Sequence, residues 1–555
     1  MMSGILCNKR NATMVLFFNI LFMWPGEGWA FYMPTGIPQA WIAPDIPAPS
    51  APSPWTTQQT GFYYVDNSVT CSDANTYGWP ATPRCKFPTS LAAGSYVEIH
   101  GGPYNWTSTA YIRSYGTASK PVWIIGAAGN SIMMGLVLHG TYMYVDGLII
   151  SGDKGISIRP YSSVQTDHIM VRNTTITGSG SLAIGTTGIY AEGGSATPFV
   201  GMIAYKNTIS YMGDSEASVE NDRHALATGS YISDVWFLDN LTHHNGGDGV
   251  QFSHGGIAAN HFYYGRNTSH DERENCVDVK IADDVVISDN ICYGIEHSSS
   301  SPGEGMVVHY NPDRISFINN IVHDCDHGIV STGSNVLSIT GNLIYNINEY
   351  SGEEHSDISS YRTGSAIMLN GTRNVFVSNN TIYNSVLGVL VEAPSDTIVP
   401  YFEITGNIIS NLKIGDYTSL PSHSVIIKGD AESVTASVIE HNLFYSPFDV
   451  YVGATHYTSL ATLQSISKCD DGIGCIDADP QFLNAPNNFS LQNSSPAKDA
   501  GYLSDVYTTF QELYSIDINK DIAGTVRPQN TFWDIGAYEF SNQSIVPKIM
   551  NIVIP

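Results

Sequence analysis

Short runs of alternating apolar and polar residues recur along the chain from Gly61 to about residue 455. Such period-two alternation is typical of β-strands with one buried face. Many runs begin with glycine or another small residue, as in Gly155-Ile-Ser-Ile-Arg159 and Gly249-Val-Gln-Phe-Ser253. Few stretches have the 3.6-residue period of a helix, so the pattern predicts an all-β protein.

A second type of run carries an asparagine followed by apolar residues, and it recurs ten times. Successive asparagines are 22 (320 to 342) to 38 (342 to 380) residues apart. A repeat of this length with two or three short strands predicts the coils of a parallel β-solenoid, and aligned asparagines can form an amide ladder. We therefore expect a single-stranded parallel β-helix of about ten or more coils. The aligned residues are Asn173, Asn207, Asn240, Asn267, Asn290, Asn320, Asn342, Asn380, Asn407 and Asn442.

The two ends of the chain have a different character. Lys9 and Arg10 precede the apolar run 14–24 and the small residue Ala30, which predicts a secretory signal peptide over 1–30. We therefore expect a secreted protein, extracellular or periplasmic, with no integral membrane segment in the mature chain. Seven prolines predict a stiff linker over 31–60. The β-helix domain is expected over 61–455, a capping segment over 456–540 and a tail over 541–555.

The cysteines suit an oxidising compartment. Cys71 and Cys85 bracket one short loop, and Cys469 and Cys475 bracket another, so each pair is expected to form a disulfide. The remaining residues of the mature chain, Cys276, Cys292 and Cys325, are expected to be small buried hydrophobic residues.

Composition and charge exclude some partners. The 555 residues include 51 acidic and 24 basic ones, giving a formal charge of −27. Nucleic acid is excluded as a partner because the phosphate backbone rewards clustered Lys and Arg. The same field repels any polyanion, so an acidic substrate would need local attraction. We expect a monomer.

Stacking of the alternating runs would align their outward residues in two columns. Polar residues of these columns concentrate in the coils from 222 to 309, which we take as the predicted site. One column is Arg159, Glu192, Thr228, Ser253, Lys280, His309, Thr332, Asn370, Glu392 and Lys428, and its neighbour is Ser157, Tyr190, Leu226, Gln251, Asp278, Val307, Val330, Met368, Leu390 and Ile426.

The repeat resembles the right-handed parallel β-helix of polysaccharide lyases. Glu274-Asn-Cys-Val-Asp-Val-Lys280 resembles the lysine-bearing coil of family 9 polysaccharide lyases, and Asp222-Arg-His224 resembles the Asp-Pro-His of alginate-active C5-epimerases, with Arg in place of Pro. Asp534-Ile-Gly-Ala-Tyr-Glu539 resembles the closing segment of secreted bacterial β-helix proteins, and we expect it to cover the last coil. The family 9 resemblance implies that Lys280 is the base and that an aspartate cluster binds Ca²⁺.

β-Elimination of a uronic-acid polysaccharide suits this set of residues. The reaction removes the C5 proton, so the site must neutralise the adjacent carboxylate and hold a base. Arginine is a bidentate partner for a carboxylate, and a lysine serves as base if its pKa is lowered. The candidate catalytic residues are Lys280, Arg223, His224 and His309; the candidate substrate-binding residues are Gln251, Ser253, His254 and Glu274; the candidate Ca²⁺ ligands are Asp222, Asp248 and Asp278.

Other functions stay open at this point. A β-helix glycoside hydrolase would use a carboxyl pair drawn from Asp248, Asp278 and Glu274, and a C5-epimerase would share the first proton abstraction. A non-enzymatic adhesin or polysaccharide-binding solenoid would need no catalytic group. Nine histidines between 243 and 327 (243, 244, 254, 261, 270, 297, 309, 323 and 327) indicate a functional face and leave a zinc site possible.

Overall fold

The computed structural model describes residues 31–541, except 87, 105–110, 128–131, 134, 153, 163, 183–185, 220–221, 254–256, 350–363, 393–400, 414–421, 429–436 and 471–473. The predicted signal peptide, His254 and residues 542–555 lie outside the described part. Contacts divide the chain into Met1–Tyr32 and Met33–Pro555, and the second unit contains every element described below.

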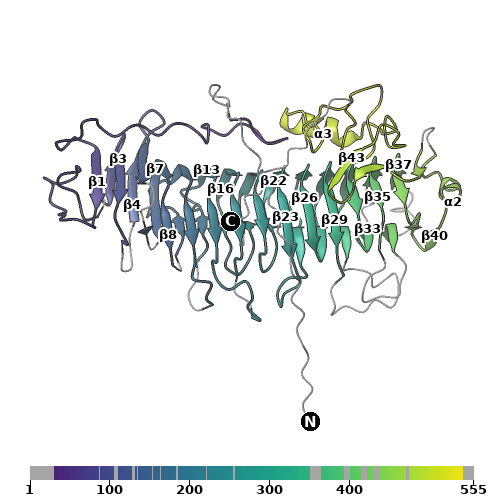
Figure 1. Cartoon of the computed structure of the whole chain (residues 1–555), viewed down its shortest axis with the longest axis horizontal. Helices are drawn as coiled ribbons and strands as arrows, with labels where there is room; N and C mark the ends of the chain where they lie inside the picture. The colour runs from purple at the N-terminus through teal and green to yellow at the C-terminus, as the bar shows by residue number, and fades with distance from the viewer. Residues whose placement is uncertain are drawn as a thin grey trace, which may run out of the picture. The chain divides into compact units, whose positions relative to one another are not determined.

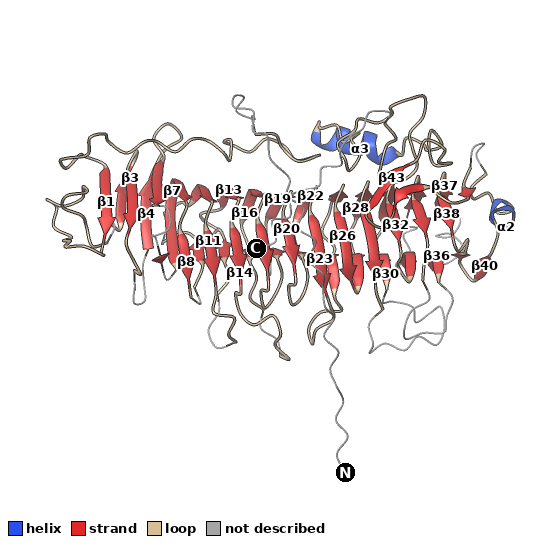
Figure 2. Cartoon of the chain, in the orientation of Figure 1, coloured by secondary structure: helices blue, strands red, loops and turns tan. Residues whose placement is uncertain are grey.

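The second unit is a parallel β-helix, as predicted (Figures 1 and 2). Each coil of its central part contributes one strand to each of three rows, and strands of successive coils pair in parallel. We call these rows 1, 2 and 3. Strand β7 (Leu136–Asp146) bridges two rows, because its first half pairs with β9 in row 1 and its second half with β10 in row 2.

Row 1 comprises β2 (Ser90–Ala92), β4 (Tyr111–Tyr115), β7, β9 (Ile156–Ile158), β12 (Ile189–Ala191), β15 (Leu226–Thr228), β18 (Val250–Phe252), β21 (Val277–Val279), β24 (Glu304–Val308), β27 (His327–Ser331), β30 (Ser365–Asn370), β33 (Leu387–Glu392), β36 (His423–Lys428) and β39 (Val450–Val452). Row 2 comprises β1 (Phe62–Asp66), β3 (Tyr96–His100), β5 (Val122–Gly126), β7, β10 (Asp167–Arg172), β13 (Phe199–Tyr205), β16 (Ile232–Leu238), β19 (Ala259–Gly265), β22 (Asp283–Ser288), β25 (Ile315–Ile318), β28 (Val336–Thr340), β31 (Asn374–Ser378), β34 (Tyr401–Thr405) and β37 (Val438–Glu440).

Row 3 comprises β6 (Ile132–Met133), β8 (Ile149–Ser151), β11 (Thr175–Thr177), β14 (Thr208–Ser210), β17 (Leu241–His243), β20 (Thr268–His270), β23 (Ile291–Ile295), β26 (Ile321–Cys325), β29 (Leu343–Ile347), β32 (Thr381–Tyr383), β35 (Ile408–Ser410), β38 (Leu443–Tyr445) and β41 (Ile476–Asp477). The end of the chain adds β40 (Thr455–Tyr457), β42 (Phe482–Asn484), β43 (Asn488–Leu491), α2 (Leu460–Gln464) and α3 (Asp505–Tyr514). Neither helix has the length and apolar character needed to cross a membrane, and the same holds throughout the described residues.

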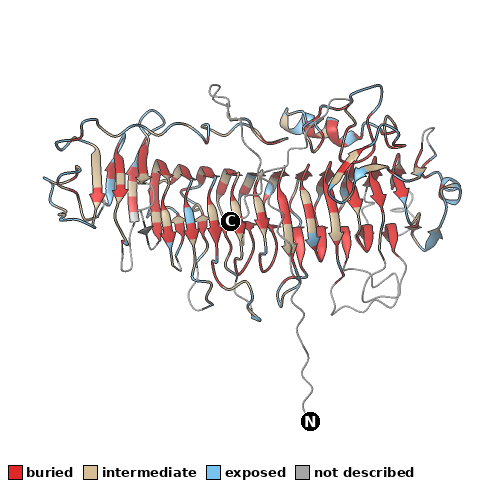
Figure 3. Ribbon diagram, in the orientation of Figure 1, coloured by how far each residue is buried: buried red, intermediate tan, exposed pale blue. Residues whose placement is uncertain are grey.

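The interior of the coils is a continuous apolar core (Figure 3). Inward residues of each strand stack on the equivalent residues of the next coil, so that Val250, Val277 and Met306 follow one another in register without exposed surface. The alternation seen in the sequence is therefore the alternation between core and exterior. It fixes which side chains of row 1 reach the outside.

The asparagine ladder runs between rows 2 and 3 and is buried. Each side-chain oxygen accepts from the amide nitrogen of the preceding asparagine's side chain and from its backbone N–H, as between Asn290 and Asn320 at 2.9 and 3.1 Å. Nine of the ten predicted asparagines, from Asn207 to Asn442, form it. The tenth, Asn173, is exposed and bonds Asp146, because Thr174 occupies the ladder position in that coil.

Residues 33–60 of the proline-rich segment lie against row 2, running back from the coil of β22 toward β1 (Figure 1). The Arg172 guanidinium donates to the Pro44 and Ile46 carbonyls at 2.9 and 2.6 Å, and the Trp236 indole donates to the Pro38 carbonyl at 3.1 Å. We predicted a linker here, and its described part is docked along several coils.

The closing segment differs from the expectation. Leu463, Cys469 and Cys475 join the core at the last coils, whereas Asp534–Glu539 lies along the flank of inner coils. The Gly536 N–H donates to the Gly406 carbonyl at 2.7 Å, and the Ala537 N–H donates to Thr381 Oγ1 at 2.9 Å. These two bonds exclude a position over the last coil, because both partners belong to coils in the interior of the stack.

Three disulfides are present among the described residues. Cys71–Cys85 and Cys469–Cys475 confirm the predicted pairs. The prediction for Cys276 and Cys292 was wrong, because these residues form a third disulfide across one coil, 16 residues apart. Cys325 is a buried thiol, as expected.

Removing one ladder asparagine should destabilise the coils. In Asn320→Ala, the Ile287 carbonyl loses a donor and the Asn290 amide loses its acceptor, all in the buried interior. Unmet buried hydrogen bonds cost about 1–3 kcal/mol each, so the free energy of unfolding should fall by about 2–4 kcal/mol, measured by urea unfolding. Asn374→Ala, at an exposed asparagine, is the control and should change little. Equal stability of the two variants would contradict a structural role for the ladder.

Candidate active site

The register of row 1 sets which residues face outward together. Tyr190, Ala227, Gln251, Asp278 and Val307 are successive partners. This confirms the predicted columns except in the coil of β15, where the alignment was wrong by one residue.

In that coil Leu226 and Thr228 point inward and are fully buried, so Ala227 and Gly229 take the outward positions. Gly229 has no room for a side chain, because a Cβ there would lie 2.4 Å from the Tyr190 hydroxyl and 2.9 Å from the Glu192 Cβ. The His-Ala-Leu-Ala-Thr run begins its strand one residue later than the sequence pattern indicated.

Lys280, Asp278 and His309 meet at the centre of the candidate site. Lys280 Nζ lies 3.0 Å from Asp278 Oδ2, and His309 Nε2 lies 3.8 Å from Asp278 Oδ1. Asp278 is on β21, and the other two residues directly follow β21 and β24, so neighbouring coils about 4.8 Å apart bring the three together. The Asp278 carboxylate is buried, whereas Lys280 and His309 are partly exposed.

Thr332 fixes the tautomer of His309. The Thr332 hydroxyl donates to the Val308 carbonyl at 3.3 Å, and its oxygen lies 3.0 Å from His309 Nδ1. Because the hydroxyl proton is directed to the carbonyl, Nδ1–H is the donor in the second bond. The lone pair of the neutral ring is then on Nε2, on the side of Asp278.

The charges of this cluster shift the pKa values of its members. Burial and then the charge of Lys280 lower the pKa of His309 to about 4, so the ring is neutral near pH 7. Burial alone would lower the pKa of Lys280, but the charge of Asp278 and the hydrogen bond to it have a larger effect, so the pKa of Lys280 is raised. The lowered pKa that a lysine base requires is therefore not provided in this arrangement. Burial and then the charge of Asp248 raise the pKa of Asp278.

A second chain of charges adjoins the first. His224 Nε2 lies 2.9 Å from Asp222 Oδ1, and Nδ1 lies 3.1 Å from Asp248 Oδ2. Burial disfavours the imidazolium, but the hydrogen bonds to Asp222 and Asp248 outweigh it and raise the pKa of His224 to about 10. The two carboxylates favour the imidazolium form of His224, whereas the Asp248 N–H, which donates to Nδ1 at 3.0 Å, favours the neutral ring.

Two amides hold Asp248 in place. Gln251 Nε2 donates to Asp248 Oδ2 at 3.2 Å, and Asn275 Nδ2 donates to Oδ1 at 2.7 Å. Gln251, predicted to bind substrate, is thus a buried support for Asp248.

The remaining predicted site residues are placed differently. Ser253 is fully buried and donates to the Gly229 carbonyl at 3.4 Å. Glu274 accepts a hydrogen bond from Ser300 and lies 3.3 Å from the Arg273 guanidinium. Arg223 lies beside Asp222 and His224 in the chain, and its Nη1 donates to the Asp222 carbonyl at 3.3 Å.

The three aspartates do not converge on one point. His224 lies between Asp222 and Asp248, bonded to them through opposite ring nitrogens, while Asp278 Oδ2 bonds Lys280. Ca²⁺ takes about six to eight oxygen ligands around one centre, and here a ring nitrogen or an ammonium group lies against an oxygen of each carboxylate. This arrangement does not fit a calcium ion.

Two residues near Lys280 were missed from the sequence. Tyr310 is 64% exposed, and its ring centroid lies 6.0 Å from Lys280 Nζ. Glu304 accepts from Ser301 Oγ at 2.9 Å, and burial raises its pKa to about 7. An aromatic residue directly after His309, just beyond β24, was the signal available for Tyr310.

The sequence matches no family model and no curated protein. Among solved structures, the chain is similar to the pectate lyase Pel9A, with 12% identity over 88% of this chain and 98% of that one and a TM-score of 0.32. The chain is also similar to the A-module of a mannuronan C-5 epimerase from Azotobacter vinelandii, with 12% identity over 60% of this chain and 90% of that one and a TM-score of 0.29. The PL6 family alginate lyase AlyGC is 13% identical over 72% of this chain and 52% of that one, with a TM-score of 0.31. Similarities this low carry no information on substrate or chemistry.

The raised pKa of the buried His224 ring should make stability depend on pH. Its pKa is raised from 6.5 to about 10, so its contribution is complete below about pH 6.5 and is lost as the pH rises toward about 10. The urea midpoint of the wild type should fall across this window, and His224→Gln should reduce that fall. His261→Gln, at a surface His–Asp pair, should retain the wild-type dependence. Parallel curves for wild type and His224→Gln would contradict the buried charge.

Proposed function

We propose that this protein is a secreted polysaccharide lyase that cleaves a uronic-acid polymer by β-elimination on row 1, at the coils from β15 to β24. The observation that carries the proposal is the Lys280–Asp278–His309 cluster, in which a partly exposed cation and a partly exposed neutral imidazole lie on either side of one buried carboxyl group. Secretion is supported by the three disulfides, which suit an oxidising compartment.

The charge states assign the roles. The Lys280 ammonium pairs with the uronate carboxylate, which makes the C5 proton more acidic. His309 Nε2 takes that proton, and Asp278 stabilises the resulting imidazolium. The electrons of the C5–H bond form the C4–C5 double bond as the C4–O4 bond breaks, and His309 returns the proton to O4 of the leaving sugar. Thr332 keeps Nε2 as the acceptor.

The surroundings support this arrangement. The exposed Tyr310 ring offers a stacking surface for a sugar beside Lys280. His224 links Asp222 to Asp248 in the neighbouring coils. The negative charge of Asp248 helps to keep the pKa of Asp278 raised. Arg223, in the same segment as His224, is the second candidate cation for a substrate carboxylate.

Substitutions at the cluster should abolish elimination. His309→Ala and Lys280→Ala should each lower kcat/KM by about 10²–10⁴-fold, because each removes a group acting on the C5 proton. The measurement is the ultraviolet absorbance of the C4–C5 double bond during digestion of a panel of uronans. Lys428→Ala is the matched control, because Lys428 occupies the same column and bonds Glu392 at 2.9 Å. Full activity of His309→Ala would contradict its role.

The pH profile should separate the two candidate bases. With His309 as base, kcat/KM should fall below about pH 4, where the ring becomes protonated. With Lys280 as base, activity should instead rise in the alkaline range, because the pKa of Lys280 is raised. The profile is read from initial rates on the best uronan of the panel, and an alkaline rise with no acidic limb near pH 4 would reassign the base to Lys280.

The same assay tests the alternative reactions. A glycoside hydrolase would release reducing ends without an unsaturated product, and a C5-epimerase would leave the chain length unchanged. The hydrolase is disfavoured because Glu274 is bound to Arg273 and Ser300, and Asp248 to Gln251 and Asn275. Repeating the digestion with added Ca²⁺ tests a calcium requirement, and unchanged activity is expected.

A further inference from the structure

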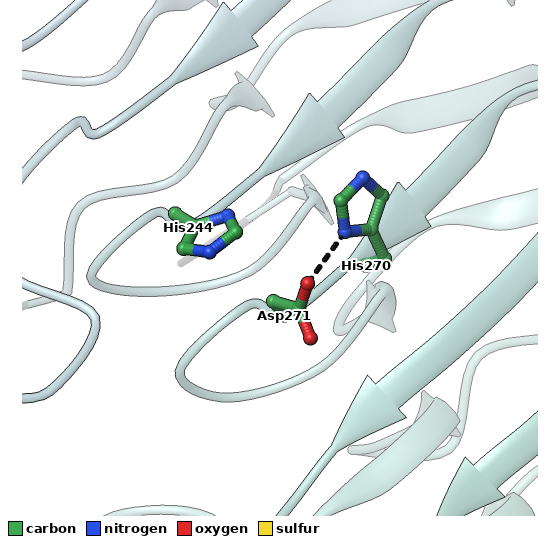
Figure 4. Close-up of side chains that lie close together, drawn as sticks. All are labelled: His244, His270 and Asp271. Atoms are coloured by element: carbon green, nitrogen blue, oxygen red, sulfur yellow. Dashed lines mark hydrogen bonds and ion pairs between the residues drawn. The ribbon is translucent and has the colours of Figure 1, made fainter. Parts of the chain in front are cut away.

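A second cluster of chemically capable side chains lies on row 3, away from the row 1 strands that carry Lys280. His244 directly follows β17, and His270 and Asp271 lie at the end of β20. One nitrogen or oxygen atom from each lies within 4.8 Å of the other two. Figure 4 shows the carboxylate of Asp271 between the two imidazole rings, with His270 bonded to it.

Coil stacking holds this cluster together. The His244 N–H donates to the Asp271 carbonyl at 3.1 Å, so the two turns are in register. Both residues have a left-handed backbone, with φ of 55° and 52°. In the next coil the equivalent position is Gly294, where a Cβ would lie 2.5 Å from Asp271 Oδ1. The missing side chain leaves the space that the Asp271 carboxylate occupies.

A third histidine completes the donor set. His243 Nδ1 lies 3.0 Å from His244 Nδ1, and the ring of His243 stacks on that of His270 with centroids 5.1 Å apart. In a hydrogen bond between two ring nitrogens one donates and the other accepts, so one of the two carries a lone pair there. The cluster therefore brings three imidazoles and one carboxylate together.

The same fold position provides an internal comparison. His323 and Asp324 repeat the His–Asp pair two coils further on, with Nδ1 and Oδ2 2.6 Å apart. The neighbours of the two pairs differ. His323 lies between Tyr293 and Tyr345 of the adjoining coils, whereas His270 has His243 as its neighbour in the preceding coil. The His–Asp pair is thus a recurring turn feature, and the additional histidines are what distinguish the cluster at 243–271.

We propose that His244, His270 and Asp271 bind one divalent transition-metal ion of the Zn²⁺ type, with His243 beside them. Two imidazoles and a carboxylate are the ligands such ions prefer, whereas Ca²⁺ and Mg²⁺ prefer oxygen alone. Metal–ligand bonds of about 2.0–2.1 Å place tetrahedral ligand atoms roughly 3.3 Å apart, so the side chains close inward on binding. The Asp271 side chain, 47% exposed, has the freedom to do so.

The ion would brace the loops that support the candidate active site. The loop from His244 ends at Asp248, and the loop from Asp271 ends at Asn275, whose side chain bonds Asp248 at 2.7 Å. Between these ends the Asn245 N–H donates to Glu272 Oε2 at 2.8 Å. A metal linking His244 to Asp271 therefore clamps the two loops at the ends opposite Asp248 and Asn275.

The test is a metal titration of the full mature protein without an affinity tag. Co²⁺ should bind at one equivalent with visible absorption bands and be displaced by Zn²⁺, and Zn²⁺ should raise the Tm. His270→Ala should weaken binding by at least the roughly 100-fold that outer-shell changes alone can cost. His323→Ala, the matched control, should bind like the wild type.

Three results would overturn the proposal: no saturable binding by the wild type, equal binding by His270→Ala, or an equal loss in His323→Ala. Asp271→Asn, a change at the surface, gives a second test should His270→Ala fail to fold. Because metal binding is read from absorbance and Tm, its outcome is independent of lyase activity.

Discussion

The buried asparagine ladder constrains the register of the β-helix over the coils from Asn207 to Asn442. Each asparagine joins its neighbours through side-chain and backbone hydrogen bonds at the same turn of successive coils, so the coils cannot slip relative to one another without leaving buried amides unpaired. With the register fixed, outward residues of row 1 align in columns about 4.8 Å apart. Asp278, Lys280 and His309 meet because of this alignment, although they come from two different coils.

Local charge, rather than net charge, governs the candidate site. The chain carries −27 overall, yet in this site the Lys280 ammonium and the His224 ring lie against buried carboxyl groups. Burial makes each of these groups depend on its partner: Asp278 keeps Lys280 charged, and Lys280 in turn helps keep His309 neutral. The Lys280–Asp278 contact therefore produces both groups that the proposed elimination needs. Lys280 is the charged group for the substrate carboxylate, and His309 is the neutral group for the proton.

Much of this could be predicted from the sequence, because strand alternation and coil repeat are local patterns. They gave the fold and nearly all the outward columns, and they pointed to the coils of Lys280 and His309. The coil of β15 was misaligned because its Ala-Leu-Ala run has no polar residue to mark the outward side. The Cys276–Cys292 disulfide depends on two strands of one coil meeting in the core, which spacing alone does not indicate. The raised pKa of Lys280 depends on a 3.0 Å contact with Asp278, and only coordinates reveal it.

In the proposed reaction, Lys280 and His309 act on the same uronate residue. It is tested most directly by a crystal structure of His309→Ala with a bound uronan oligosaccharide. A sugar carboxylate should lie at Lys280 Nζ, with the C5 hydrogen directed at the space vacated by the imidazole. An oligosaccharide bound elsewhere on the coils, or one whose carboxylate points away from Lys280, would contradict it.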